Sequence, residues 1–169
     1  MKQLHVTLIL FCCLCTIGAV AQEKPLSPQE TVDAKIDGVS ITIVYCRPSA
    51  RGRTMIGGKE PFGQVWRTGA NAATTITFDK DVKIEGKDLP AGKYSLFTIP
   101  NKDEWTIIFN SVHTQWGHYD YDKSKDVLRV TAKVEKPKSF VETFTISTDK
   151  NKVNLAWENY QVAFNVKAK

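Results

Sequence analysis

The sequence predicts an all-β domain, an antiparallel two-sheet β-sandwich of immunoglobulin-like or jelly-roll type, with a closed barrel as the alternative. Apolar and polar residues alternate with period two in one segment after another. Turn-forming stretches such as Glu85-Gly86-Lys87 and Leu89-Pro90-Ala91-Gly92 separate these segments. Apolar residues at helical spacing are hard to find after the N-terminal segment, which argues against helices.

The alternation places the strands in order along the chain. In VSITIVY, Val39, Ile41, Ile43 and Tyr45 share one side, and the pattern predicts about eight or nine short strands. Because the strands are half polar, they favour sheets with one face in water over a parallel sheet buried on both faces. The further strand segments are TTITF, DVKIEG, GKYSLFTIP, EWTIIFN, DVLRVTAKV, FVETFTIS, KVNLAWE and YQVAFNV. The large residues predicted to lie in the core are Phe97, Trp105, Phe144 and Trp157.

The N-terminal segment has the layout of a secretory signal peptide. Lys2 precedes an uncharged run from Val6 to Val20, and Ala19-Val20-Ala21 is a small-x-small cleavage site. The run is short for a membrane anchor, which needs about 20 apolar residues. We therefore expect a signal peptide at 1–21, a flexible leader at 22–29 and a single domain at 30–167. This predicts a periplasmic or secreted protein with no membrane span after cleavage.

The cysteines and the charge pattern argue against several kinds of site in this protein. After cleavage only Cys46 remains, so no internal disulfide is expected, and a buried strand residue is favoured over a reactive thiol. Lipid attachment is disfavoured because no small residue precedes Cys12, Cys13 or Cys15. Lysines and acids are interspersed, which does not resemble a nucleic-acid-binding face. No motif predicts a cofactor or a metal.

Two irregular stretches interrupt the strands, and long loops on a rigid scaffold often carry function. The first long loop, residues 46–71, offers Arg47, Arg53, Trp66, Arg67 and Asn71 as ligand-binding candidates. Guanidinium groups match carboxylates and phosphates, and an indole can stack on a ring. The competing and favoured interpretation is structural: Trp66 fills the core, Arg67 pairs with an acid and Asn71 caps a turn.

The second long loop, residues 110–126, interleaves aromatic and hydrogen-bonding residues, with His113, Trp116 and Tyr119 as ligand-binding candidates. A hydrolase using His113 or His118 as its base, with a serine at 49 or 111 as nucleophile, is an alternative that no catalytic motif supports. A metal on His113, His118 and Asp120 matches no known spacing. The segment with the acids at 120, 122 and 126 lacks the glycine and the glutamate that a calcium-binding loop requires. We therefore expect these acids to form a solvated turn.

Several stretches are similar to those of a known family. SPQETVDAKIDGV, Arg47-Pro48-Ser49, Gly52-Arg53, WRTGAN and QWGHYDYD resemble secreted bacterial proteins catalogued as domain of unknown function twenty-nine eleven. The likeness runs from about Ser27 to Phe164, although Cys46 stands where serine is commoner in that family. The resemblance implies a secreted or envelope setting and a β-rich fold, and it brings no established activity.

Together these observations predict a non-enzymatic binding module that recognises a polar small molecule, a glycan or another envelope component through both long loops. Enzymatic hydrolysis and a purely structural role in envelope assembly remain the alternatives. Oligomeric state is left open. The binding hypothesis requires that the two loops meet and that their tryptophans, Trp66 and Trp116, are not both buried in the core.

Overall fold

The computed structural model describes residues 25–169, so the predicted signal peptide at 1–21 lies outside the described residues. The chain forms one antiparallel sheet of 11 strands, and residues 25–169 contain no α-helix and one short 3-10 helix, η1 (Lys123–Lys125). The strands are β1 (Gln29–Ile36), β2 (Val39–Cys46), β3 (Thr75–Phe78), β4 (Val82–Ile84), β5 (Lys87–Leu89), β6 (Gly92–Ile99), β7 (Glu104–Asn110), β8 (Asp126–Glu135), β9 (Val141–Asp149), β10 (Lys152–Glu158) and β11 (Tyr160–Ala168).

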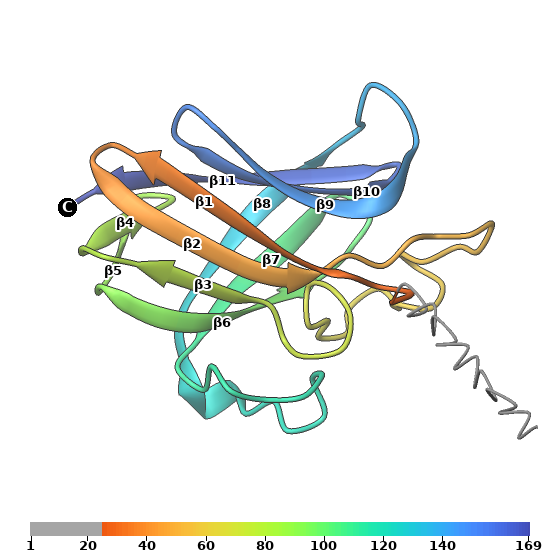
Figure 1. Ribbon diagram of the computed structural model, residues 1–169, viewed down its shortest axis with the longest axis horizontal. Helices are drawn as coiled ribbons and strands as arrows, with labels where there is room; N and C mark the ends of the chain where they lie inside the picture. Colours follow the sequence, from red (N-terminus) through yellow and green to blue (C-terminus); the bar gives the residue numbers. More distant parts are fainter. Residues whose placement is uncertain (1–24) are drawn as a thin grey trace, which may run out of the picture.

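The sheet curls into a nearly closed barrel. Hydrogen-bonded neighbours follow one path, β1-β2-β3-β6-β7-β8-β11-β10-β9, and the short β4 pairs with β11 and β5. Figure 1 shows β9, β10 and β11 on one side, β1, β2, β3 and β6 on the other, and β7 and β8 crossing between them. The all-β antiparallel class is confirmed. Two separate sheets are not confirmed, because the path has no break.

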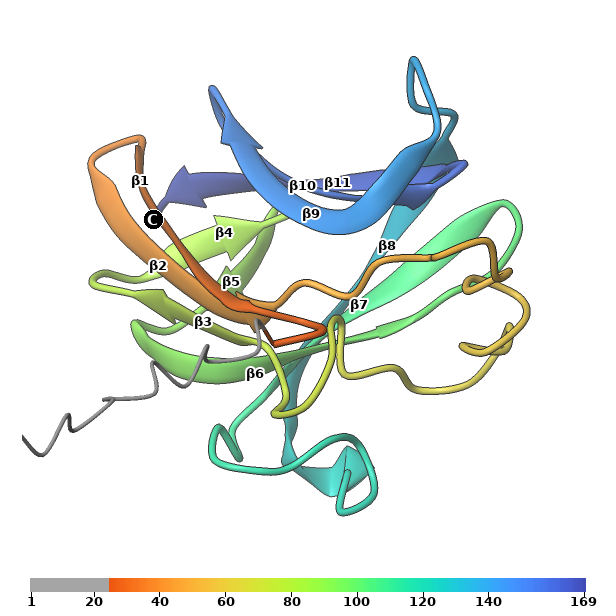
Figure 2. The ribbon, with the colours of Figure 1, turned by 45° about the vertical axis from the view of Figure 1, so that its right-hand side comes forward.

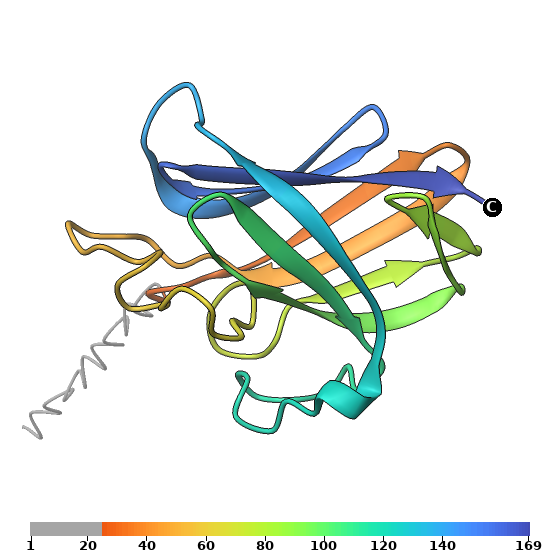
Figure 3. The same cartoon turned by 180° about the vertical axis from the view of Figure 1, so that it is seen from behind.

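Backbone contacts that follow β2 join the first long loop to the edge strand β9. Pro48 accepts a hydrogen bond from the Phe144 amide at 2.9 Å, and the Ala50 amide donates to Glu142 at 2.9 Å. The first long loop therefore begins by running along the edge strand β9, as the views in Figures 2 and 3 allow the reader to follow. This pairing covers an edge that would otherwise offer free backbone groups to another chain.

Aromatic rings fill the interior. Phe97, Trp105, Phe144 and Trp157 are all fully buried, which confirms the predicted core residues. Trp105, Phe144 and Trp157 surround the indole ring of Trp66. Phe97 packs in a smaller cluster with Ala73 and Ile108. That smaller cluster also receives Val65 and Tyr121 from the two long loops, which explains why β6 is buried on both faces.

Two strands were not expected from the alternation. β1 covers the end of the predicted leader and the start of the predicted domain, and β5 overlaps two predicted turns. β1 is half exposed along its length and β5 has only three residues, so neither shows a strong apolar face. Tertiary pairing stabilises both strands, β1 against β2 and β5 against β4. No helix in the part of the chain described here is long and apolar enough to cross a membrane.

Candidate functional site

The two long loops meet through their backbones. Ala72, directly after the first long loop, forms a bridge with Trp116 of the second. The Ala73 amide donates to the Gln115 carbonyl at 3.1 Å, and the Gly117 amide donates to the Asn71 carbonyl at 3.0 Å. Asn71 has a left-handed φ of 59°, a conformation that asparagine tolerates better than most residues. The loops therefore hold each other in a defined place beside β3 and β6.

Trp66 does not belong to an exposed recognition surface, and the ligand-stacking interpretation of this residue is wrong. It is only 1% exposed and its indole N–H donates to the Gly69 carbonyl at 3.0 Å. Its ring stacks on Trp157 with centroids 5.5 Å apart and meets Phe144 edge-on at 4.9 Å. Its burial leaves no ring face free for a ligand, so the structural interpretation of this tryptophan holds.

Two of the candidate arginines, Arg47 and Arg53, bond to other groups of the protein itself. Arg47 forms an ion pair with Glu30 at 2.6 Å and donates to Thr145 Oγ1 at 2.9 Å, so it ties β1 to β9 at the barrel seam. Arg53 donates to the carbonyls of Ala50 and Ser49 at 2.9 and 3.0 Å. Both guanidinium groups thus stabilise the path of the first long loop.

The larger of two clefts beside the loop contact has a volume of about 510 Å³ and is called here the Trp116 cleft. β2, β3 and β6 supply its floor, and residues 113–116 form one wall. Trp116 is 66% exposed, whereas Cys46 on the floor is only 9% exposed. The polar side chains lining it include Lys93, His113 and Gln115.

A second cleft of about 330 Å³, called here the His118 cleft, is lined by Lys59, Glu60, Gln64 and His118, with Trp66 contributing to its wall. Burial raises the pKa of Glu60, an effect that the positive charge of Arg67 opposes. Burial also lowers the pKa of His118, and Arg67 adds to that effect. The His118 ring stacks on Tyr119 with centroids 5.1 Å apart.

The serines and histidines of the hydrolase alternative are not joined to each other. Ser49 Oγ lies 2.8 Å from Thr143 Oγ1, and Ser111 Oγ donates to the Lys125 carbonyl at 3.1 Å. The only side-chain partner of His113 within residues 25–169 is Thr114, at 3.4 Å. In the same part of the chain, no group of three or more histidine, cysteine or acidic side chains gathers as a metal site.

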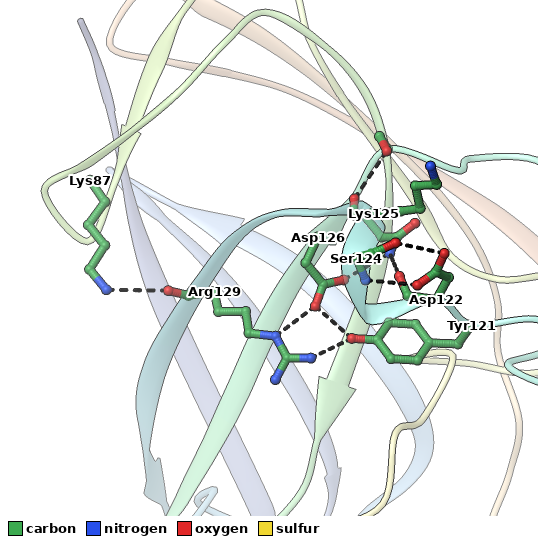
Figure 4. Close-up of polar contacts among 9 residues, drawn as sticks. Lys87, Tyr121, Asp122, Ser124, Lys125, Asp126 and Arg129 are labelled. Carbon is green, nitrogen blue, oxygen red and sulfur yellow. Dashed lines mark hydrogen bonds and ion pairs between the residues drawn. The ribbon is translucent and has the colours of Figure 1, made fainter.

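The acids of the second long loop are not all solvated, which corrects the expectation for Asp126. Its side chain is 7% exposed and accepts hydrogen bonds from Tyr121 at 2.6 Å, Arg129 at 2.7 Å and Asn110 at 2.8 Å (Figure 4). Asp122 instead accepts a hydrogen bond from the Ser124 amide at the start of η1. Residues three apart on a strand face opposite sides, so spacing alone did not indicate the ion pair of Asp126 with Arg129.

This cluster predicts how stability changes at alkaline pH. Burial, followed by the Asp126 carboxylate, raises the pKa of Tyr121 to about 12 from 10.0. Between these values the folded state keeps a proton that the unfolded state loses, so the free energy of unfolding falls as pH rises. We expect Tyr121→Phe to remove that part of the decline in urea titrations across this range. Tyr119→Phe, which alters a 78% exposed ring, is the matched control. Equal slopes for wild type and Tyr121→Phe would contradict the assignment.

Comparison with known proteins gives one match. A family model described as "Protein of unknown function (DUF2911)" matches residues 27–166. The match spans both long loops and includes strands from β1 to β11. Neither a curated protein nor a solved structure matches the chain.

Proposed function

Because the chain belongs to DUF2911, a family of proteins of unknown function, we propose a function from the geometry of its loops. The protein is a secreted or periplasmic binding module that holds a polar, ring-containing ligand with an acidic group in the Trp116 cleft. An acidic sugar, free or as part of an envelope glycan, has this chemistry. The secreted or periplasmic setting rests on the N-terminal segment and on the family resemblance.

The exposed indole of Trp116 is the observation that carries the proposal. Covering the face of a large aromatic side chain lowers the free energy of the system, yet this side chain is 66% exposed beside a cleft. Backbone pairing of Trp116 with Ala72 orders this part of the loop, so less conformational entropy is lost when a ligand binds. The apolar face of a sugar ring fits such a surface.

The rest of the cleft indicates what else the ligand carries. Lys93 extends from β6 and His113 from the second long loop, and both line the same space. A lysine amine favours a carboxylate or another acidic group, while Thr75 and Gln115 offer hydrogen bonds to hydroxyls. The volume of about 510 Å³ lies within the range of roughly 300–1,000 Å³ that is usual for small-ligand sites.

Titration with glucuronate and glucose, a charged and a neutral sugar of similar shape, tests this proposal. Three of the four tryptophans are buried, so the solvent-exposed part of the fluorescence reports Trp116. We expect saturable quenching by glucuronate and weaker quenching by glucose. Trp116→Ala should weaken binding by about tenfold, followed calorimetrically, and Lys93→Met should remove the preference for the acid.

Phe140→Ala is the matched control, because Phe140 is also an exposed aromatic residue, at 53%, and lines a different depression. Its affinity should equal that of the wild type. Equal affinity of Trp116→Ala and wild type for glucuronate would contradict the proposal, as would a quenching that never saturates with either sugar.

A further inference from the structure

Arg67 differs from the other arginines of this protein. The chain has five, and the guanidinium groups of Arg47, Arg51, Arg53 and Arg129 all donate hydrogen bonds to protein oxygens. Among residues 25–169, no group accepts a hydrogen bond from the Arg67 side chain, and no carboxylate lies within 4.0 Å of it. Its Nε is nevertheless buried, and a buried N–H without an acceptor is destabilising.

The guanidinium of Arg67 reaches from the first long loop to the second. A Cβ added to Gly117 would lie 3.4 Å from Arg67 Nη1 and 3.1 Å from the Tyr119 ring, and Gly117 has a φ of 69°. A side chain at position 117 would therefore crowd the Tyr119 ring and touch the guanidinium. Because Gly117 has no side chain, Arg67 has room beside the His118 cleft. There the Arg67 charge lowers the pKa values of both Glu60 and His118.

His118 adds a second polar atom in need of a partner. Its Nδ1 is buried and has no hydrogen-bond partner among residues 25–169. Burial disfavours the charged form of the ring, and a neutral imidazole with its proton on Nδ1 is a donor. Lys59, which lines the same cleft, provides a third donor and a second positive charge. These groups together match the oxygens of an oxyanion.

We propose that the His118 cleft is a second binding site, which holds a carboxylate or phosphate oxyanion between Arg67 and His118. It is separate from the Trp116 cleft, and it stands whether or not a sugar binds there. The oxyanion gives the guanidinium an acceptor, which no group among residues 25–169 supplies. A group of this kind could belong to a free anion or to a larger molecule that projects it into the cleft.

Glu60 limits the affinity for the anion. Replacing it should therefore strengthen binding, whereas replacing Arg67 or His118 should weaken it. Its carboxylate would repel the anion, but burial already favours the protonated form. Glu60→Gln imitates that neutral form, while the backbone contacts of residue 60 with Gly57 and Met55 remain. Above the pKa of Glu60, where its carboxylate is charged, we expect this variant to bind the anion about fivefold more tightly, since one repelling charge is removed. A variant that merely loosens the loop would not gain affinity.

The experiment follows the five arginine Nε–H signals of the whole secreted chain by NMR during separate titrations with inorganic phosphate and with acetate. We expect a saturable shift of the Arg67 signal, while the signals of Arg47, Arg53 and Arg129 stay in place because their Nε–H groups are already bonded. Arg67→Lys and His118→Phe should each weaken binding, followed calorimetrically, by about tenfold. His118→Phe keeps a ring that can stack on Tyr119.

The two titrations distinguish the source of the oxyanion. Tighter binding of phosphate indicates a phosphorylated ligand, and tighter binding of acetate indicates a carboxylated one; both support the site. Trp116→Ala should leave the phosphate and acetate affinities unchanged, which separates this inference from the proposed function. The inference is overturned if the Arg67 signal does not saturate with either anion, or if Glu60→Gln abolishes binding.

Discussion

Replacing Trp66 with alanine is expected to lower the free energy of unfolding by about 3–5 kcal/mol, the usual cost of removing a large buried aromatic side chain. Trp66 packs against three other large rings, and its contact with Trp105 has centroids 6.0 Å apart. Its indole N–H is also bonded within the loop, so alanine removes a hydrogen bond as well as packing. Urea-induced unfolding followed by circular dichroism measures the change.

Trp116→Ala is the control for this prediction, because it removes the same side chain from an exposed position. Its effect on the free energy of unfolding should stay within about 0.5 kcal/mol, as for most surface substitutions. A loss of less than about 1 kcal/mol for Trp66→Ala would mean that the indole is not part of the tightly packed interior. The pair of variants therefore separates the two tryptophans by role.

Replacing Glu158 with alanine is expected to destabilise the fold by about 3 kcal/mol, because it leaves two buried amides without an acceptor. Glu158 is 6% exposed, and its two carboxylate oxygens accept hydrogen bonds from the Met55 amide at 2.9 Å and the Ile56 amide at 2.7 Å. It is the last residue of β10 and thus attaches the first long loop to the barrel.

Glu158→Gln separates the loss of charge from the loss of both acceptors, since the amide keeps one carbonyl oxygen. We expect an intermediate effect on the free energy of unfolding, and faster hydrogen exchange at Met55 and Ile56 in both variants. Glu104→Ala, at an exposed position of β7, is the matched control and should be close to neutral. Unchanged exchange at both amides in Glu158→Ala would contradict the proposed attachment.

The candidate site was only partly predictable from the sequence. Loop length and composition indicated both long loops, and the alternation predicted that Trp105 and Trp157 are buried. The sequence offered no means of telling Trp66 from Trp116, since each lies in an irregular segment. Their different exposure follows from where each loop crosses the barrel: the first turns inward beside Phe144, and the second passes over β3 and β6.

The fate of the arginines shows the same limit. Arg47, Arg53 and Arg67 are alike as residue types, and each stands in the same loop. Arg47 finds two of its acceptors on β9, 97 and 98 residues away along the chain, whereas Arg67 finds none among the described residues 25–169. Glu158, which attaches the first long loop from a distance of 102 and 103 residues, could not be recognised as buried for the same reason.

The amino-acid sequence by itself determined the all-β antiparallel class, most of the strands, the aromatic core and the family resemblance. These follow from short-range physics, because alternation sets which face of a strand is apolar and turn residues set where it ends. Only the tertiary structure decided that the sheet curls into a nearly closed barrel, that the two long loops bond to each other, and that the Arg67 side chain has no hydrogen-bond partner among residues 25–169. These depend on groups far apart in the chain, whose proximity no local pattern encodes.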